Sequence, residues 1–171
     1  MKQFLSVLAL LTTLQGFSQS QNQYEVTGEG RHKILKGILT RDLIAQDTAF
    51  KWYQQNQAGY TPQADALNAV KTKATQVQYL VFGGTWCGDT KYILPKFFLL
   101  LDAAGVQQTH VTLIGVDRHK KTFSNLTDAL NIQYVPTIIV LKDGKEVGRV
   151  VEYGKTGQWD KELGEIVNTI K

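Results

Sequence analysis

The chain has 171 residues, a formal net charge of +4 and a single cysteine. This length is sufficient for one domain with a buried core, and one cysteine excludes a disulfide within the chain. The basic clusters at 31–33 and 118–121 are short and contain no aromatic residues. We therefore interpret both clusters as solvated loops, and nothing in the charge balance indicates a nucleic-acid partner.

Residues 1–18 have the pattern of a secretory signal peptide. Lys2 precedes an apolar stretch at 4–14, which is shorter than the roughly 20 residues that a membrane-spanning helix needs. We predict cleavage between Ser18 and Gln19, which leaves a periplasmic or secreted protein without a membrane span. The alternative for the apolar stretch is a buried N-terminal helix.

The rest of the chain divides into residues 19–60, which we predict to be an N-terminal extension packed on the domain, and the domain itself at 61–171. In the extension, residues 32–40 are consistent with a strand and residues 41–55 with a helix. We find no pattern of catalytic residues in this part, so we assign it a structural role.

The domain shows alternating helical and strand patterns. In chain order we first expect a helix at 62–74 with Thr61 as its N-cap, a strand at 77–82, and a helix from Cys87 to about Ala104 that ends at Gly105. A strand at 110–117 and a short helix at 124–131 follow. The chain then forms a hairpin of 136–142 and 145–153 around Asp143-Gly144, and ends in a helix capped by Thr156. A strand, helix, strand unit implies parallel pairing, whereas the hairpin adds an antiparallel edge. The predicted fold class is α/β, with a central mixed sheet and helices on both faces.

Cys87 lies where a buried strand ends and a helix begins. The free backbone N–H groups and the dipole at a helix start stabilise a thiolate, which is the reactive form of cysteine. Asp89 opposes a second negative charge at this place, and Lys91 offsets part of that repulsion if its side chain folds back. The sequence leaves the balance between these two modulators open.

Several motifs in this order resemble the thioredoxin superfamily. They are "WCGDTK" at 86–91 with Pro95 eight positions after the cysteine, "YVPT" at 134–137, "KDGK" at 142–145, and Gly154 before the last helix. The resemblance covers about residues 60–171. It implies a thioredoxin-like three-layer sandwich and chemistry on thiols and disulfides, with Pro95 as a kink in the active-site helix.

The resemblance also implies how clients bind. Pro136 would be a cis proline beside the cysteine, and the backbone at Val135 would pair with an extended client peptide. Trp86, Gly88 and Gly154 would complete the client surface. For Trp86, simple packing is an equally open interpretation.

Two departures from the family pattern bear on function. Thr90 stands where a dithiol member has its second, resolving cysteine, and Val81 stands where the family has a buried acid. A threonine hydroxyl can donate a hydrogen bond to the Cys87 thiolate but cannot attack a mixed disulfide. Both departures argue against a dithiol reductase.

We therefore carry two hypotheses. The first is an exported monothiol protein that uses Cys87, assisted by Thr90, for thiol–disulfide exchange as a carrier or isomerase, with exported clients or a partner thiol. The second is a non-catalytic module that binds peptides. A peroxidatic thiol is a distant third. We expect no cofactor and no metal, because His32, His110 and His119 lack metal-ligand spacing.

Overall fold

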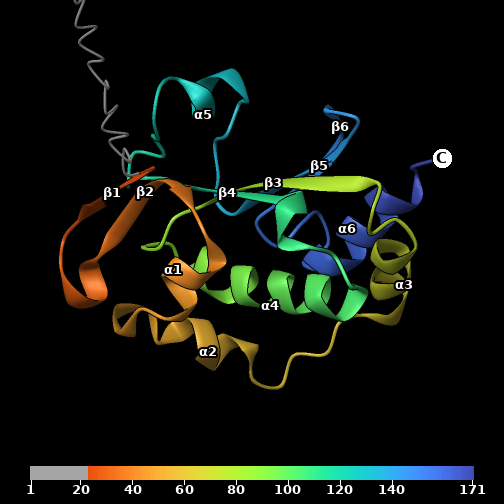
Figure 1. Cartoon of the computed structure of the whole chain (residues 1–171), viewed down its shortest axis with the longest axis horizontal. Helices are drawn as coiled ribbons and strands as arrows, with labels where there is room; N and C mark the ends of the chain where they lie inside the picture. The colour runs from red at the N-terminus through yellow and green to blue at the C-terminus, as the bar shows by residue number, and fades with distance from the viewer. Residues whose placement is uncertain (1–22) are drawn as a thin grey trace, which may run out of the picture.

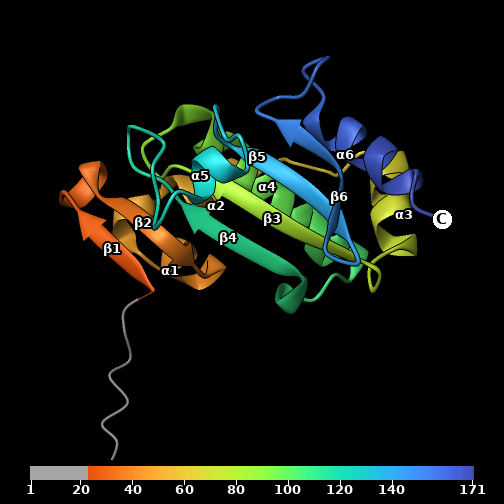
Figure 2. The same cartoon turned by 90° about the horizontal axis from the view of Figure 1, so that it is seen from above.

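The computed structural model describes residues 23–171, which form a single six-stranded sheet with helices on both faces (Figure 1). The predicted signal peptide at 1–18 lies outside the described residues. The strands are β1 (Tyr24–Thr27), β2 (Ile34–Leu39), β3 (Val77–Gly83), β4 (Val111–Gly115), β5 (Thr137–Lys142) and β6 (Lys145–Val151). Their order across the sheet is β1-β2-β4-β3-β5-β6, which is seen from above in Figure 2.

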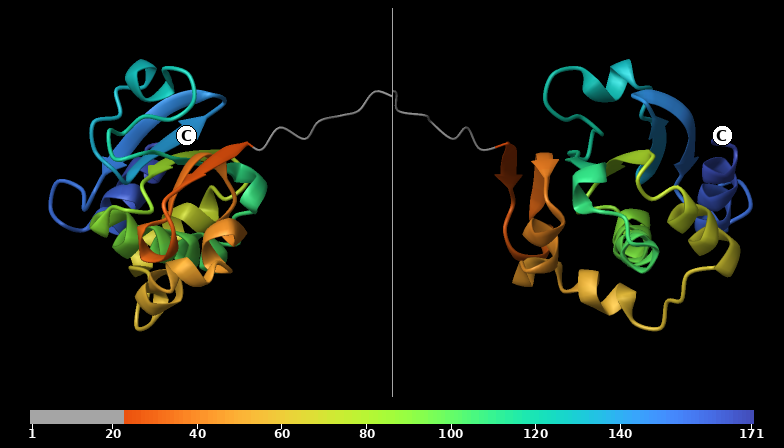
Figure 3. Two further views of the ribbon diagram at one scale, coloured as in Figure 1. Left: turned by 90° about the vertical axis from the view of Figure 1, so that its left-hand side faces the viewer. Right: turned by 45° about the vertical axis from the view of Figure 1, so that its right-hand side comes forward.

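The helices cover the two faces unequally. They are α1 (Arg41–Ala45), α2 (Trp52–Gln57), α3 (Ala64–Thr72), α4 (Gly88–Ala104), α5 (Leu126–Ala129) and α6 (Trp159–Asn168), with short 3-10 turns η1 (Gly30–His32), η2 (Thr48–Phe50) and η3 (Gln108–His110). Helix α5 lies on one face of the sheet, and the long α4 lies on the other with α3 and α6 beside it (Figure 3). The predicted α/β fold is confirmed.

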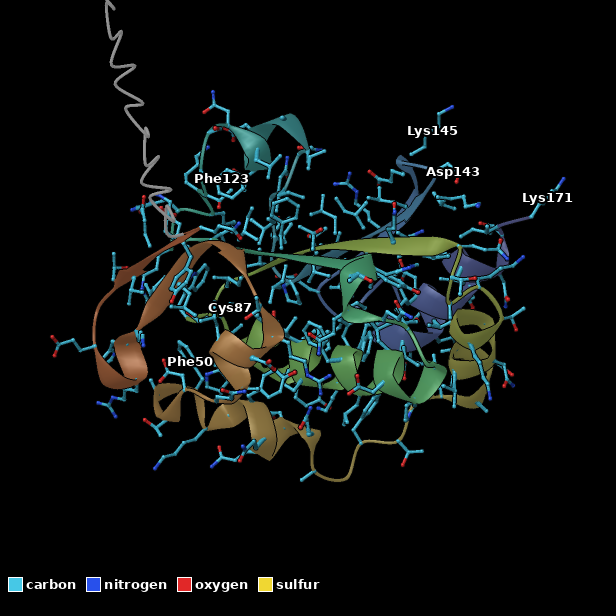
Figure 4. All side chains as sticks on the ribbon, in the orientation of Figure 1. Phe50, Cys87, Phe123, Asp143, Lys145 and Lys171 are labelled. Atoms are coloured by element: carbon cyan, nitrogen blue, oxygen red, sulfur yellow. The ribbon has the colours of Figure 1, made fainter. Side chains whose placement is uncertain are left out.

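The strand pairing decides which loops meet at the same edge of the sheet. β3 and β4 are parallel, as the sequence predicts, while the other neighbouring pairs are antiparallel. Val77 pairs with Lys142, whereas Phe82 pairs with Thr137. The hairpin turn that contains Asp143 and the cysteine that follows β3 therefore lie at opposite ends of the sheet, as Figure 4 shows.

Alternation along β3 supplies two apolar cores. Val77, Tyr79 and Val81 face α4 and are at most 1 % exposed, whereas Phe82 faces the α5 side. Helix α4 is apolar over most of its circumference because it lies between the sheet and α2, and its buried residues include Ile93, Leu94, Phe97, Phe98, Leu100 and Leu101. This packing fixes the start of α4, and hence Cys87, against the end of β3.

Residues 23–60 contribute to the sheet itself. β2 pairs with β4, β1 adds the edge strand, and α2 packs on α4. The helix expected at 41–55 is wrong as a single element, because Asp47 accepts a hydrogen bond from the backbone N–H of Ala49 and starts a new turn. The strand at 24–27 was missed, since it has only four residues and lies mostly exposed at the edge of the sheet.

Two helices begin later than their sequence caps indicate. α3 starts at Ala64 instead of after Thr61, and Asp160 of α6 accepts hydrogen bonds from the Tyr60 hydroxyl at 2.9 Å and the backbone N–H of Gln63 at 3.4 Å. These contacts hold the chain extended up to Gln63.

α6 starts at Trp159 instead of after Thr156. Glu162 accepts a hydrogen bond from the backbone N–H of Lys155 at 2.7 Å, which holds the chain in a turn before the helix. The expected ends are confirmed at Gly105 and at the Asp143-Gly144 hairpin, where all three residues adopt the left-handed conformation. None of the helices in residues 23–171 has the length and apolar character needed to cross a membrane.

Candidate functional site

Cys87 is the N-cap residue of α4. Its backbone N–H donates to the carbonyl of Gly84 at 2.9 Å, and its own carbonyl accepts from the N–H of Lys91 at 3.1 Å, which is the first bond of the helix. The side chain is partly exposed and its sulfur is a free thiol. The structure therefore places the only sulfhydryl of the chain at a helix start, within reach of solvent.

The sulfur also touches the loop that precedes β5. The Val135-Pro136 peptide bond is cis, and Cys87 Sγ donates a hydrogen bond to the carbonyl oxygen of Val135 at 3.1 Å. Two further bonds fix this loop, since Thr137 Oγ1 donates to the carbonyl of Tyr134 at 2.7 Å and the N–H of Glu152 donates to the carbonyl of Pro136 at 2.7 Å. When the sulfur loses its proton or forms a disulfide, the Val135 carbonyl loses its donor and becomes available to another N–H group.

Thr90 holds the turn between β3 and α4. It is 1 % exposed, and its hydroxyl oxygen accepts a hydrogen bond from the N–H of Gly84 at 3.2 Å. A Cβ atom at Gly84 would lie 2.7 Å from the Trp86 ring, and one at Gly83 would lie 3.0 Å from the Thr90 methyl group. The two glycines thus allow the close approach of both side chains. Donation from the Thr90 hydroxyl to a thiolate stays a prediction.

Trp86 joins the thiol to the loop that follows β4. Its ring N–H donates to the carbonyl of Val116 at 3.0 Å, and the ring packs with the apolar core on the α5 side. The Arg118 guanidinium lies 5.7 Å from the Trp86 ring centroid. The packing role of Trp86 is therefore observed, and its partly exposed ring leaves contact with clients as a prediction.

A second aromatic group lies near the thiol. The rings of Tyr92 and Tyr153 are 5.7 Å apart, and the ammonium of Lys96 lies 2.8 Å from the Tyr92 ring centroid. Partial burial and the neighbouring carboxylate of Asp89 raise the pKa of Tyr153, and Tyr92 and Cys87 add to this effect. Asp89 therefore faces Tyr153 across the start of α4. Neither tyrosine was singled out from the sequence.

The remaining predicted site residues differ in their surroundings. Gly88 is exposed, with open space where a Cβ atom would point, and Lys91 is partly exposed on the first turn of α4. Gly154 has φ = 75°, and a Cβ atom there would lie 2.6 Å from a Glu162 carboxylate oxygen, so this glycine serves the turn after β6. Roles of these residues in client binding stay predictions.

The histidines do not form a shared site. His110 Nδ1 bonds to the carbonyl oxygen of Val77 at 2.8 Å, His32 pairs with Arg31, and His119 is exposed. Among residues 23–171, no three His, Cys, Asp or Glu side chains gather closely enough to hold a metal ion.

Comparison with known proteins agrees with this geometry. The family model described as Thioredoxin matches residues 63–165, which include Cys87 and Pro136. The chain belongs to the thioredoxin family. It is 31% identical over 93 residues to a thioredoxin of Echinococcus granulosus, which covers 54% of this chain and 80% of that protein. It is also 29% identical over 149 residues to the chloroplastic thioredoxin F of Oryza sativa subsp. japonica, covering 81% of this chain and 74% of the relative.

A third relative is much longer than this thioredoxin-family protein. The chain is 33% identical over 91 residues to the TPR repeat-containing thioredoxin TDX of Arabidopsis thaliana, which is 53% of this chain and 22% of that protein. The similarity to TDX therefore concerns a small part of the relative only.

The basic loop at 118–121 of this thioredoxin-family protein is solvated as predicted, with Arg118, His119 and Lys121 exposed. Its position beside the thiol, shown by the contact of Arg118 with Trp86, was not predicted. The signal was present, because β3 and β4 were predicted to be parallel and the loops after parallel strands emerge at the same edge of a sheet. The two tyrosines carry no comparable signal in the sequence.

Proposed function

We propose that this protein performs thiol–disulfide exchange through Cys87 alone, as an exported monothiol carrier or isomerase. The observation that supports this proposal best is the position of the sulfur. It is partly exposed at the start of α4 and lies 3.1 Å from the Val135 carbonyl oxygen in the cis-proline loop. A client disulfide that approaches this loop meets the nucleophile directly.

The proposed reaction has two exchange steps. Cys87 gives its proton to solvent, and its thiolate attacks one sulfur of a client disulfide; a mixed disulfide forms and the other client sulfur leaves as a thiolate. A thiolate of the client, or of a small external thiol, then attacks the client sulfur of the mixed disulfide and releases Cys87 as a thiolate, which takes up a proton. When the second attacker belongs to the client, the client is rearranged without net oxidation or reduction.

The Val135 carbonyl gives the mixed disulfide a way to hold an extended client. In the free protein this oxygen accepts from Cys87 Sγ. Once the sulfur is bonded to the client, the oxygen can accept a hydrogen bond from a client N–H. Binding of the client backbone would thus be coupled to formation of the covalent bond. The protein would then hold a client more tightly in the mixed disulfide than in a non-covalent complex.

We further propose that residues 1–18 direct export to a periplasmic or extracellular space. Such compartments are oxidising, and a free thiol there risks irreversible oxidation unless it exchanges with partner thiols. A monothiol protein that works by exchange suits that setting, because each cycle returns the cysteine to its reduced form.

Reactivation of a protein with scrambled disulfides tests the proposed function. In a buffer with a small thiol, the wild-type protein should speed recovery of the client's activity several-fold over the buffer alone. Cys87→Ser should give no acceleration. Lys145→Ala is the matched control, because Lys145 lies at the far end of the sheet (Figure 4) and should not affect the rate. Acceleration by Cys87→Ser equal to that of the wild type would refute exchange through this sulfur.

The second candidate, a peptide-binding module, is favoured by the exposed aromatic side chains near the cis-proline loop. Tyr134 is 54 %, Tyr92 45 % and Tyr153 36 % exposed. Aromatic side chains supply much of the binding energy at protein interfaces. In the reactivation assay, this alternative predicts that wild type and Cys87→Ser bind the client equally and that neither speeds its recovery.

A further inference from the structure

We propose that Arg118 and Lys120 make this protein select clients that carry acidic residues next to their disulfide cysteine. This inference rests on the proposed exchange function and names the class of substrate for it. It is carried by the position, the contacts and the unbalanced charge of the loop at 117–121, which follows β4.

The fold brings this loop to the thiol. Gly83 at the end of β3 pairs with Gly115 at the end of β4, and the N–H of Val116 donates to the carbonyl of Gly83 at 3.0 Å. Because the two strands are parallel, the chain leaves both of them at the same edge of the sheet. Trp86 closes the connection through its hydrogen bond to the Val116 carbonyl.

Two cations of the loop lie over aromatic rings next to the site. These rings belong to the residues that directly precede Cys87 and Val135. The Arg118 guanidinium is 5.7 Å from the ring centroid of Trp86, the residue before Cys87. The Lys120 ammonium is 5.9 Å from the ring centroid of Tyr134, the residue before Val135. Cation–π contacts of this kind hold both charges near the rim of the site.

The loop has a defined conformation. A carboxylate oxygen of Asp117 accepts hydrogen bonds from the backbone N–H groups of His119 and Lys121, each at 2.9 Å. Partial burial opposes ionisation of Asp117, but these bonds outweigh it and keep the pKa of the carboxyl below its ordinary value. Lys120 adopts the left-handed conformation with φ = 58°. The backbone of this turn therefore keeps one conformation at neutral pH, which sets the directions in which its side chains leave it.

The charges of the loop are not neutralised evenly. Lys121 is paired with Asp128 at 2.6 Å, and the Lys36 ammonium lies 3.6 Å from Asp117. Arg118 and Lys120, by contrast, form no ion pair with any other part of residues 23–171. Both positive charges can therefore pair with carboxylates of a client that binds near Trp86 and Tyr134.

Charges of both signs lie at the start of α4, since Asp89 lies beside Tyr153 and the Lys96 ammonium lies against the Tyr92 ring. A client with carboxylates near Arg118 and Lys120 gains attraction over about 8 Å, the screening length at physiological salt. Such complementarity acts chiefly on the rate of encounter and on the choice of partner.

Three peptide disulfides of equal length test the inference, with Asp, Gln or Lys on both sides of the cysteine. The measured quantity is the rate at which each forms a mixed disulfide with the protein, divided by its rate with a small neutral thiol. This ratio removes the effect of the flanking charges on the leaving thiolate. The wild type should favour the Asp peptide over the Lys peptide by about tenfold at low salt, and high salt should reduce this preference.

The variant that decides the assignment is Arg118→Gln combined with Lys120→Gln. It should lose most of the preference, so that its ratios for the Asp and Lys peptides approach its ratio for the Gln peptide. The matched control is Lys145→Gln combined with Lys171→Gln, which removes the same charge at positions away from Cys87 (Figure 4) and should keep the preference. The inference would be overturned if the wild type gave equal ratios for all three peptides, or if the preference survived in the Arg118 and Lys120 double variant. Neither result would contradict the proposed exchange function. Absence of reaction with every peptide would overturn the proposed function as well.

Discussion

Thr90→Cys should turn a persistent mixed disulfide into a transient one. Residues 87 and 90 are three apart at the start of α4, which is the spacing of the two cysteines in a Cys-x-x-Cys motif. In the variant, the new thiolate attacks Cys87 Sγ, an intramolecular disulfide forms and the client leaves as a thiolate. The rate of client release without external thiol should rise by at least about 100-fold, because the attack becomes intramolecular.

The control for this variant is Thr90→Ser. Serine keeps the hydroxyl that accepts from the Gly84 N–H, so it should preserve the turn and release its client as slowly as the wild type. Intact-mass spectrometry of isolated mixed disulfides follows both variants over time. If Thr90→Cys folds and its mixed disulfide still persists, then absence of a second sulfur is not what limits release from this site.

Val81→Asp should destabilise the protein strongly, because the family's buried acid has no place prepared for it here. Val81 is fully buried, and its neighbours on the adjacent strands are Leu113 and Ile138. A carboxyl group in this core has no designed partner, and we expect the free energy of unfolding at pH 7 to fall by about 3–5 kcal/mol. Denaturant unfolding of both proteins measures the difference.

The pH dependence of that difference identifies its cause. Burial raises the pKa of the introduced carboxyl above the value of about 3.9 in the unfolded chain. The unfolded state then loses its proton first as the pH rises, so the loss of stability should be smallest near pH 4 and grow toward pH 7. Val81→Ala is the control, since it creates a cavity without a charge. A loss for Val81→Asp that is equal at both pH values would assign the effect to packing alone.

Much of the fold was predictable from local patterns. The strand predicted at 77–82, the long apolar helix after Cys87 and the Asp143-Gly144 turn each carry strong local signals, and all three are observed, the strand with Gly83 as one further residue. The order of these elements also predicted the parallel pairing of β3 with β4. The start of α6 was not predictable, because it depends on Glu162 and the turn that contains Gly154, contacts that form only after the chain has folded.

The sequence predicted the thiol and the cis-proline loop of the candidate site, but not the aromatic side chains around them. Cys87 at the helix start and Val135-Pro136 opposite it followed from motifs, and the structure places their atoms 3.1 Å apart. The rim depends on tertiary contacts, such as Tyr92 with Tyr153, that no sequence period marks. The basic loop is different, because the topology alone would have placed it beside the thiol.

The central claim is that Cys87 is an accessible nucleophile that forms a mixed disulfide and has no means within the chain to resolve it. Intact-mass spectrometry of the wild-type protein after reaction with a symmetric peptide disulfide tests it most directly. The account predicts one peptide per chain, absent in Cys87→Ser. Once the freed peptide thiol has been removed, this peptide should remain attached until an external thiol is added. A wild-type protein that stays unmodified by the peptide disulfide, or whose peptide is released without any added thiol, would contradict it.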